Sequence, residues 1–381
     1  MDNERLTAEQ LRWYRLRRSG LVEPFPTPEE AARDLAGVQA QILSAAGLAL
    51  RNRTPRLTYE RFDALLHEER ELVKLWGQRG TLHVYPTAEW PLIYAARQAR
   101  QSWWERQGEQ HGAAAYARLV EEVEALLRER GTLTRSELRE ADLGLSDHDF
   151  SGWGGIFAHL VHRGEACHAG QRGNEGLFAH RNHWQPDLAW EPPTTEAANV
   201  ELVRRFFHTY GPATEQDFRY WRRARAADSR RWIAALGEAL MEVAVEGHEA
   251  PLLALCSDLD VLQESPPPPE AWPVRLLYRF DPLLLGIKDK SWLIEEACYD
   301  RVWRPAGHIE GTVLEAGRIR GTWRYDRLGG GLVVTVYPFT PLAGRTRAAV
   351  EREAQGVAAF FGMALVALEF ESEARQTAGE L

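Results

Sequence analysis

The stretches GTLTRSEL (residues 131–138) and GPATEQDF (residues 211–218) decide the fold that this sequence predicts. They begin eighty residues apart, and each follows a segment whose apolar residues recur at helical spacing. Repetition of this kind indicates tandem supersecondary modules. In the first copy we expect a helix over 116–130 that ends at Gly131, and Thr134 followed by Glu137 is a capping-box signature for the next helix.

The segments that follow these two stretches complete the same pattern twice. The first copy continues with a third helix over about 152–163 and a hairpin in EACHAGQRGNEGLFAH (165–180). The second copy has helices at 196–209, from about 215 and from near Ala227, and then a two-stranded wing over 242–255. The order helix, short helix, helix and β-hairpin predicts a winged helix in each copy.

The two ends of the chain extend this organisation. The N-terminal part has the same order less regularly, with helices expected at 7–19, 28–37 and 58–67 and a hairpin at 71–86. At the other end, the proline-rich SPPPPEAWP (265–273) can continue neither a helix nor a central strand and indicates a domain boundary.

Beyond the prolines, alternating runs and turn signals predict a small antiparallel sheet or barrel over 274–340, beginning with RLLYRFDPLLLGI (275–287). A helix over 346–362 and a last strand, LVALEF, follow. The predicted fold class is α+β. Its domains are winged helices at 1–110, 111–190 and 191–264 and a C-terminal β-domain with a closing helix at 265–381.

Composition excludes several classes of protein. With 381 residues, 44% of them hydrophobic, the chain is long enough to bury substantial cores. Its cysteines, Cys167, Cys256 and Cys298, lie far apart, so the sequence predicts neither a disulfide framework nor a cysteine zinc site. No run approaches the roughly 18 apolar residues of a membrane span, and MDNERLTAEQ does not resemble a secretion signal. We expect a reduced protein of the cytoplasm.

The charge distribution bears on nucleic-acid binding. The net charge of −9 argues against a polyanionic partner, but the acidity is concentrated at residues 241–381, with 14 basic and 21 acidic groups. Only three of the 46 basic residues are lysine, so nearly every cation is a guanidinium suited to bidentate phosphate contacts. A genome-wide bias towards arginine codons explains this excess equally well.

The common catalytic motifs are missing from the sequence. It contains no HExxH, no Walker loop, no GxGxxG after a strand and no GxSxG, which leaves proteolysis, NTP hydrolysis and dinucleotide chemistry without their required parts. The segments HRNH (180–183) and HRGEACH (162–168) come closest to a metal-ligand cluster, but they flank a predicted wing rather than a cavity. We expect no metal and no cofactor.

Two glutamines in GVQAQILSAAGLALRNR (37–53) are candidates for chemistry. Side chains at i and i+2 share a face only if the backbone is extended, so Gln39 and Gln41 converge if an extended segment precedes a helix capped by Ser44. Two convergent carboxamides can orient a water, although neither is a strong base at neutral pH. On these residues alone, glutamines that are solvated or that cap backbone groups remain the alternative.

Six separated motifs resemble one family along roughly residues 6–370: LAGVQAQ with LALRNR, RGTLHVYP, YGPATEQDF, RFDPLLLGIKDK, VWRPAGHI, and RGTW ahead of LVVTVYPF. The chain resembles the AlkZ-like winged-helix DNA glycosylases, bacterial enzymes that excise alkylated bases and unhook interstrand crosslinks. The resemblance implies three winged helices and a β-domain in a C shape around duplex DNA. The family's signature, Gln, an apolar residue and then Gln or Asp, maps onto Gln39, Ala40 and Gln41.

The resemblance also implies an activity and partners. We expect a monomeric, monofunctional glycosylase that hydrolyses the N-glycosidic bond of N7-alkylated purines, acts on double-stranded DNA with alkylated or crosslinked bases, and uses Gln39 and Gln41 as catalytic residues. Asp281 is expected to cap backbone amides and is left out of the site. The candidate DNA-binding residues are Arg51, Arg79, His83, Arg222, Arg223, Arg324 and Arg327.

Two other functions remain compatible with the sequence. A catalytically silent winged-helix regulator would bind duplex DNA whether or not the glutamines were present, since the fold itself specifies no reaction. A protein-interaction module would bind DNA negligibly, which the acidic net charge permits.

Overall fold

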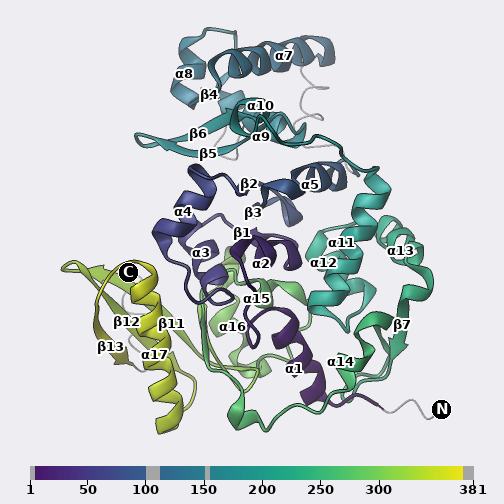
Figure 1. Cartoon of the computed structure of the whole chain (residues 1–381), viewed down its shortest axis with the longest axis vertical. Helices are drawn as coiled ribbons and strands as arrows, with labels where there is room; N and C mark the ends of the chain where they lie inside the picture. The colour runs from purple at the N-terminus through teal and green to yellow at the C-terminus, as the bar shows by residue number, and fades with distance from the viewer. Residues whose placement is uncertain (1–4, 100–111, 151–154, 372–381) are drawn as a thin grey trace. The chain divides into compact units, whose positions relative to one another are not determined.

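The computed structural model describes residues 5–99, 112–150 and 155–371 (Figure 1). Contacts within the chain divide it into two compact units, one made of Met1–Phe62 with Val203–Leu381 and the other of Asp63–Leu202. The first unit therefore combines both ends of the sequence. The predicted modules are smaller than these units, and no division between the units falls at the proline-rich segment, so the modular boundaries stay predictions.

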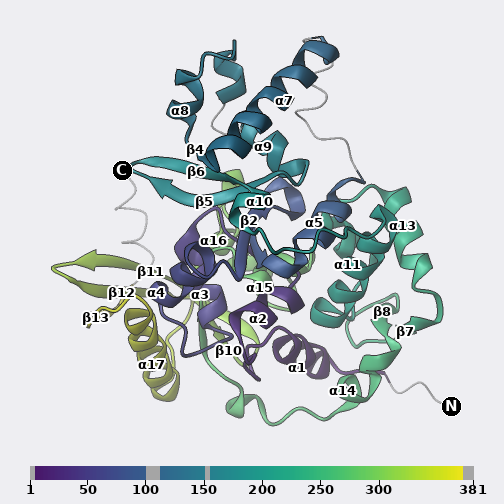
Figure 2. The ribbon, with the colours of Figure 1, turned by 45° about the horizontal axis from the view of Figure 1, so that its top comes forward.

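The second unit, Asp63–Leu202, contains helices and two antiparallel hairpins. Its strands follow the order β3-β2-β5-β6-β4, and α7, α8 and α9 pack beside the second hairpin (Figure 2). The strands are β2 (Leu72–Trp76), β3 (Leu82–Pro86), β4 (Thr132–Leu133), β5 (Ala166–Arg172) and β6 (Glu175–His180). The helices are α5 (Trp90–Arg97), α7 (Ala113–Arg130), α8 (Arg135–Glu140), α9 (Gly155–His162) and α10 (Arg181–Trp184).

The local signals predicted for this unit are confirmed. Helix α7 ends at Gly131, which has a φ of +75° that favours glycine. The Thr134 hydroxyl accepts the Glu137 amide at 3.2 Å while the Glu137 carboxylate accepts the Thr134 amide at 2.8 Å, so the predicted capping box begins α8. Both predicted hairpins are present. Of the predicted third helix, residues 152–154 lie outside the described ranges.

The helical part of the first unit also matches the predicted order. A buried cluster that includes Leu11, Tyr14, Val243 and Leu262 packs α1 against β7 and α14. The elements are α1 (Ala8–Arg18), α2 (Pro28–Asp34), β1 (Val38–Gln39), α3 (Leu43–Arg51), α12 (Glu215–Arg222), α13 (Ala226–Ala235), β7 (Leu240–Val243), β8 (Leu252–Leu255) and α14 (Leu259–Gln263). Two further helices, α4 (Tyr59–His67) and α11 (Thr195–Tyr210), cross the boundary between the units.

The second copy of the sequence repeat has the same physical basis as the first. Thr214 accepts the Asp217 amide at 3.1 Å, and the Asp217 carboxylate accepts the Thr214 amide at 3.0 Å, which forms a capping box at the start of α12. The two repeated stretches, 131–138 and 211–218, therefore both contain the start of a helix.

The C-terminal part of the first unit forms a five-stranded sheet in the order β13-β12-β11-β10-β9. Neighbouring strands are antiparallel except β12 and β13, which run parallel with α17 between them in the sequence. The elements are β9 (Arg275–Leu277), β10 (Gly311–Glu315), β11 (Arg318–Leu328), β12 (Gly331–Pro338), α17 (Gly344–Phe360) and β13 (Leu365–Phe370). The predicted antiparallel sheet, closing helix and final strand are confirmed.

The expectation of a strand over RLLYRFDPLLLGI was wrong beyond Leu277. Residues Pro282–Gly286 form a short helix, α15, because Pro282 is preorganised for a first helical position and the Asp281 carboxylate accepts the Leu283 amide at 2.9 Å. The apolar run that suggested a strand is the buried surface of this helix. Asp281 has the capping role expected of it.

The structure thus has mixed α and β elements, as the predicted α+β class requires. Within the described residues, no helix combines the length and apolar character needed to span a lipid bilayer.

Candidate active site

The two glutamines meet at the start of α3. Residues Val38–Gln39 form the short strand β1, and this extended backbone lets the two side chains share one face. The Gln39 amide nitrogen donates to the Gln41 carbonyl oxygen at 2.8 Å. Gln39 is 5% exposed, whereas Gln41 is exposed. The predicted convergence is confirmed: one carboxamide is held inside the protein and fixes a second that faces solvent.

The cap of α3 differs from the prediction. Ile42 is the N-cap residue, and its side chain makes no capping hydrogen bond because it has no acceptor. Ser44 lies inside the first turn, where its hydroxyl oxygen is 3.5 Å from the hydroxyl of Tyr325 on β11. Ile42 is 36% exposed beside the glutamines. The first turn of α3 therefore presents an apolar side chain and contacts the C-terminal sheet.

Aromatic residues support this end of α3. The ring of Tyr325 lies 5.1 Å from that of Tyr278 and 5.2 Å from that of Phe361. Burial and the neighbouring Tyr325 raise the pKa of Tyr278 to about 12, so its phenol stays protonated at neutral pH. The guanidinium of Arg327, an exposed residue of β11, lies 4.6 Å from the Phe361 ring centre. Among the predicted DNA-binding arginines, Arg327 is therefore the one that is connected to the start of α3, through Phe361 and Tyr325.

Arg51 lies at the other end of α3, about 12 Å along the helix from its first residue. Its guanidinium is 3.6 Å from the Glu353 carboxylate on α17, and burial lowers its pKa despite that carboxylate. The structure does not bring Arg51 to the glutamines, and its contacts are those of a packing residue.

The remaining candidates are dispersed. Arg324 pairs with the buried Glu310 at 2.7 Å, so its guanidinium is held beside that carboxylate rather than at the hairpin tip. Arg222 ends α12, and the exposed Arg223 follows it with a φ of +56°. In the second unit, Arg79 has a φ of +57° in the β2–β3 turn. His83, 3% exposed, has its Nδ1 3.0 Å from the Thr81 carbonyl oxygen.

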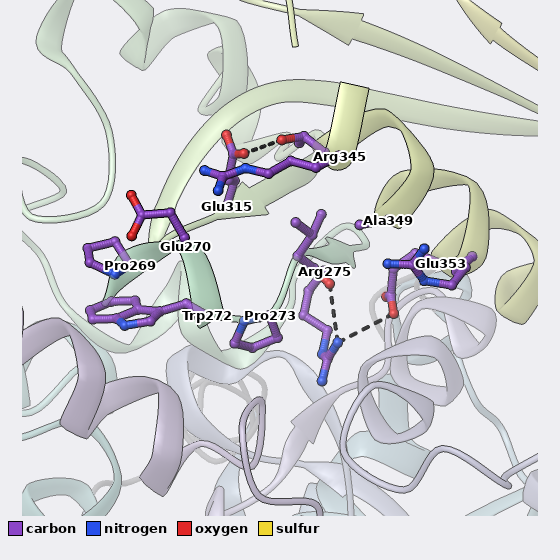
Figure 3. Close-up of a pocket in the computed structure, with 12 residues that line it drawn as sticks. Pro269, Glu270, Trp272, Pro273, Arg275, Glu315, Arg345, Ala349 and Glu353 are labelled. Atoms are coloured by element: carbon purple, nitrogen blue, oxygen red, sulfur yellow. Dashed lines mark hydrogen bonds and ion pairs between the residues drawn. The ribbon is translucent and has the colours of Figure 1, made fainter. Parts of the chain in front are cut away.

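A cavity of about 300 Å³ in the first unit does not coincide with the glutamines (Figure 3). It lies between the proline-rich segment and α17, with Trp272 and Pro273 on one side and Ala349 on the other. Its charged groups include the pair Arg275 and Glu353, whose side chains approach to 3.5 Å. Paired charges and the absence of a glutamine from its lining distinguish this cavity from the α3 site.

A group of possible metal ligands forms in the second unit from the two histidine motifs and helix α7. Within the described ranges, Glu124, Glu165 and His180 place one ligand atom each within 4.8 Å of one another. Arg128 lies 2.5 Å from Glu124 and Arg181 lies 3.6 Å from Glu165. Burial and then Arg128 lower the pKa of His180. Guanidinium groups already balance both carboxylates, so we assign this cluster a structural role.

Tyr278 and Tyr325 and the ion pairs that Glu310 forms with Arg304, His308 and Arg324 were not predicted from the sequence. Tyr325 lies between RGTW and LVVTVYPF, two stretches that carried the family resemblance, but nothing in its spacing indicated α3 as its neighbour. The segment WRPAGHIE (303–310) gave a usable signal, because it places two basic side chains and one acid in a short turn ahead of a strand.

Comparisons with known proteins agree with the fold and identify the family. Residues 32–360 match the family described as DNA glycosylase AlkZ-like. An interstrand DNA cross-link repair glycosylase from Streptomyces sahachiroi is 33% identical over 358 residues, which cover 89% of this chain and 92% of that protein. The structure of the Streptomyces sahachiroi DNA glycosylase AlkZ superimposes with a TM-score of 0.81 at 28% identity, covering 96% of this chain and all of that one. The chain belongs to the AlkZ-like family of DNA glycosylases.

Proposed function

We propose that this glycosylase is monofunctional and hydrolyses the N-glycosidic bond of N7-alkylated purines, including those in interstrand crosslinks. Gln39 and Gln41 position the attacking water. The observation that carries the proposal is the hydrogen bond between the two carboxamides, one buried and one exposed, at the start of α3. The similar Streptomyces sahachiroi protein, named for interstrand cross-link repair, supports the crosslinked substrate.

The chemistry of the lesion suits a site without a strong acid or base. An N7-alkylated purine is a cation that departs as a neutral base, so the bond breaks with little help at the leaving group. The enzyme has to stabilise an oxocarbenium-like sugar and deliver water to it. The Gln41 oxygen keeps a second lone pair after accepting from Gln39, and this lone pair can accept a hydrogen bond from the water or face the developing positive charge.

The buried glutamine has a different part in this scheme. Because Gln39 is shielded from solvent and donates to Gln41, it holds the exposed carboxamide in one orientation before DNA binds. Preorganised dipoles of this kind need no reorganisation when charge develops. The exposed Ile42 offers an apolar surface beside the reacting base.

The helical segments supply a means of DNA binding. We interpret residues 111–190 and 191–264 as winged helices because both have three helices followed by a two-stranded hairpin. Arg222 and Arg223 lie at the end of the second helix of the latter segment and would contact phosphates.

The first test uses a duplex oligonucleotide with one N7-methylguanine and a second duplex with a nitrogen-mustard crosslink. Wild-type protein is expected to leave abasic sites that alkali cleaves, and Gln39→Ala or Gln41→Ala should each slow the reaction on the order of 10²-fold. Gln263→Ala, which removes an exposed glutamine from the same unit, is the matched control. Duplex binding without abasic product would instead indicate a silent DNA-binding protein.

A further variant tests the role of Gln41. Gln41→Asp introduces a full negative charge and a proton acceptor at the exposed position, so it should gain activity on a neutral damaged base such as hypoxanthine. Wild-type protein should prefer the cationic lesion. Equal rates of the two proteins on both substrates would show that Gln41 does not face the reacting sugar or its water.

A further inference from the structure

A buried carboxylate in the C-terminal sheet is surrounded by four basic side chains. Glu310, fully buried just before β10, pairs with Arg324 at 2.7 Å and Arg304 at 3.1 Å, with His308 at 3.4 Å and Arg279 at 3.9 Å. Burial raises the pKa of Glu310, but the hydrogen bond and charge of Arg324, with His308 and Arg304, outweigh it, and the pKa is lowered. Glu310 is therefore an anion at neutral pH.

The Glu310 cluster carries more positive than negative charge. Three guanidinium groups against one carboxylate leave two positive charges, before His308 is counted. The side chains of Arg279, Arg304 and Arg324 are 23%, 24% and 25% exposed, so each reaches the surface while its carboxylate partner stays inside. Burial and two further acids, Glu371 and Asp326, raise the pKa of Tyr337, on which Arg324 and Glu310 also act. Like charges held this close are stabilised by a bound anion, and a planar guanidinium fits phosphate oxygens.

Two buried hydroxyls lie beside the cluster on the same face of the sheet. Thr312 and Thr322 are opposite one another on β10 and β11, and Arg324 follows Thr322 by two residues, so all three point to one side. The hydroxyls are 0% and 1% exposed and have no hydrogen-bond partner in the described part of the chain. Buried hydroxyls are usually satisfied. Phosphate oxygens, or the water that accompanies them, would supply acceptors.

The cluster and the start of α3, which follows the glutamines, lie on opposite faces of one ribbon formed by β11 and β12. Arg324 and Tyr325 are consecutive on β11 and point to opposite sides. The Tyr325 hydroxyl is 3.5 Å from Ser44, three residues after Gln41, whereas Arg324 belongs to the Glu310 cluster. Strands β11 and β12 pair continuously to a tight turn at Leu328–Gly331 (Figure 2). A two-stranded ribbon of this kind fits the major groove of duplex DNA, which is also where N7 of guanine lies.

We propose that the Glu310 cluster binds a backbone phosphate of the undamaged strand, while the glutamines on the other face of the β11–β12 ribbon act on the damaged strand. The inference rests on the proposed function for the identity of the DNA. In a groove, the two backbones flank the inserted ribbon, so a ribbon with catalytic groups on one face and a phosphate site on the other contacts both strands. The Glu310 cluster would then set the depth at which the ribbon docks.

The test is a phosphate scan. Single phosphates are replaced by uncharged methylphosphonates, first on the damaged strand and then on the complement, and the Kd of wild type is compared with that of Arg279→Gln. Arg279 is chosen because its 3.9 Å contact with Glu310 is the longest in the cluster, and His308→Gln serves as a second variant. Arg345→Gln, which removes an exposed arginine from the same unit, is the control. Circular dichroism melts verify that each variant is folded.

In wild type, one methylphosphonate on the complement should weaken binding about tenfold, and the same substitution should have no further effect on Arg279→Gln. Arg279→Gln should also lower the slope of log K against log salt by about 1. The control Arg345→Gln removes an arginine outside the cluster and should leave this slope unchanged. The inference would be overturned if the effect of Arg279→Gln depended only on methylphosphonates in the damaged strand, or on none in either strand. Binding of inorganic phosphate without any such dependence on a DNA phosphate would also overturn it. All of these measurements are binding constants, so a negative result here can be distinguished from a negative result in the glycosylase assay.

Discussion

Arg53 and Asp281 form an ion pair in which both side chains are fully shielded from solvent. The guanidinium donates to the two carboxylate oxygens at 2.8 and 2.9 Å and also to the carbonyl oxygens of Ser19 and Ala49. Asp281 in turn accepts the Leu283 amide at the start of α15. The pair therefore joins the segment just after α3 to the C-terminal segment, and its two ion-pair hydrogen bonds use the bidentate geometry of arginine.

Removing one partner of this pair should be severely destabilising. Arg53→Met leaves an unpaired buried carboxylate, and we expect a loss of about 3–5 kcal/mol in the free energy of unfolding. Urea denaturation measures it, and the double variant Arg53→Met/Asp281→Asn should recover part of the loss. Arg231→Met breaks an exposed pair with Asp228 and should cost less than about 1 kcal/mol. Similar losses for the two single variants would show that burial does not decide the strength of the Arg53 pair.

At the scale of elements, the β11–β12 hairpin depends on its two turn glycines. Gly329 and Gly330 have φ values of +59° and +81°, the left-handed pair that a two-residue type I′ turn requires. This turn matches the twist of the ribbon, and it places Leu328, 67% exposed, at the tip. Sequence alone indicated a turn at LGGG because glycine supplies such dihedrals without steric cost.

Gly329→Val should unpair the end of the ribbon, because a β-branched residue in the left-handed region costs about 1–2 kcal/mol. Gly329→Asn should be tolerated, since asparagine visits this region readily. Hydrogen exchange of the β11 and β12 amides reports the pairing, and duplex affinity should fall with it. Gly344→Ala, at the exposed start of α17, is the control. Unchanged protection in Gly329→Val would mean that the turn does not determine the register.

Sequence reasoning succeeded for elements whose signals are local. The capping boxes at Thr134 and Thr214, the helix end at Gly131 and the hairpins all arise from residues within a few positions of one another. It failed for DPLLLG, where an apolar run of five residues fits a buried strand and a buried helix equally well. The aspartate and proline before the run decide the outcome, and the prediction gave them less weight than the leucines.

At the scale of the whole molecule, the features that could not be predicted from the sequence are contacts between residues far apart in the chain. The glutamine pair was predictable because its members are two residues apart, but Tyr325 reaches Ser44 across 281 positions and Arg53 reaches Asp281 across 228. The Glu310 cluster is assembled from three separate segments. The same holds for the first compact unit, which closes residues 1–62 onto the C-terminal half. Single-sequence patterns carry no information about such closures.

The second unit should be the acid-sensitive part of the molecule. Burial, followed by nearby positive charges, lowers the pKa of His159 to about 4 and that of His162 to about 3, and it lowers the pKa of His168 well below its usual value. Each ring is neutral in the folded unit but takes up a proton near pH 6.5 once unfolded. The unfolded state therefore binds more protons between about pH 6.5 and 4, and stability falls as the pH is lowered through that window.

Each fully titrating histidine contributes up to about 1.4 kcal/mol per pH unit, so the loss should reach several kcal/mol before most carboxylates protonate. Hydrogen exchange at pH 7 and pH 5, corrected for intrinsic rates, should show protection lost first in Asp63–Leu202 and later in the first unit. His159→Gln/His162→Gln should flatten this dependence even if it lowers stability at neutral pH, because the proton-linked difference disappears. His183→Gln removes an exposed histidine of the same unit and should keep the wild-type slope. An equal slope in the double variant would mean that the buried histidines are not the groups that make this unit sensitive to acid.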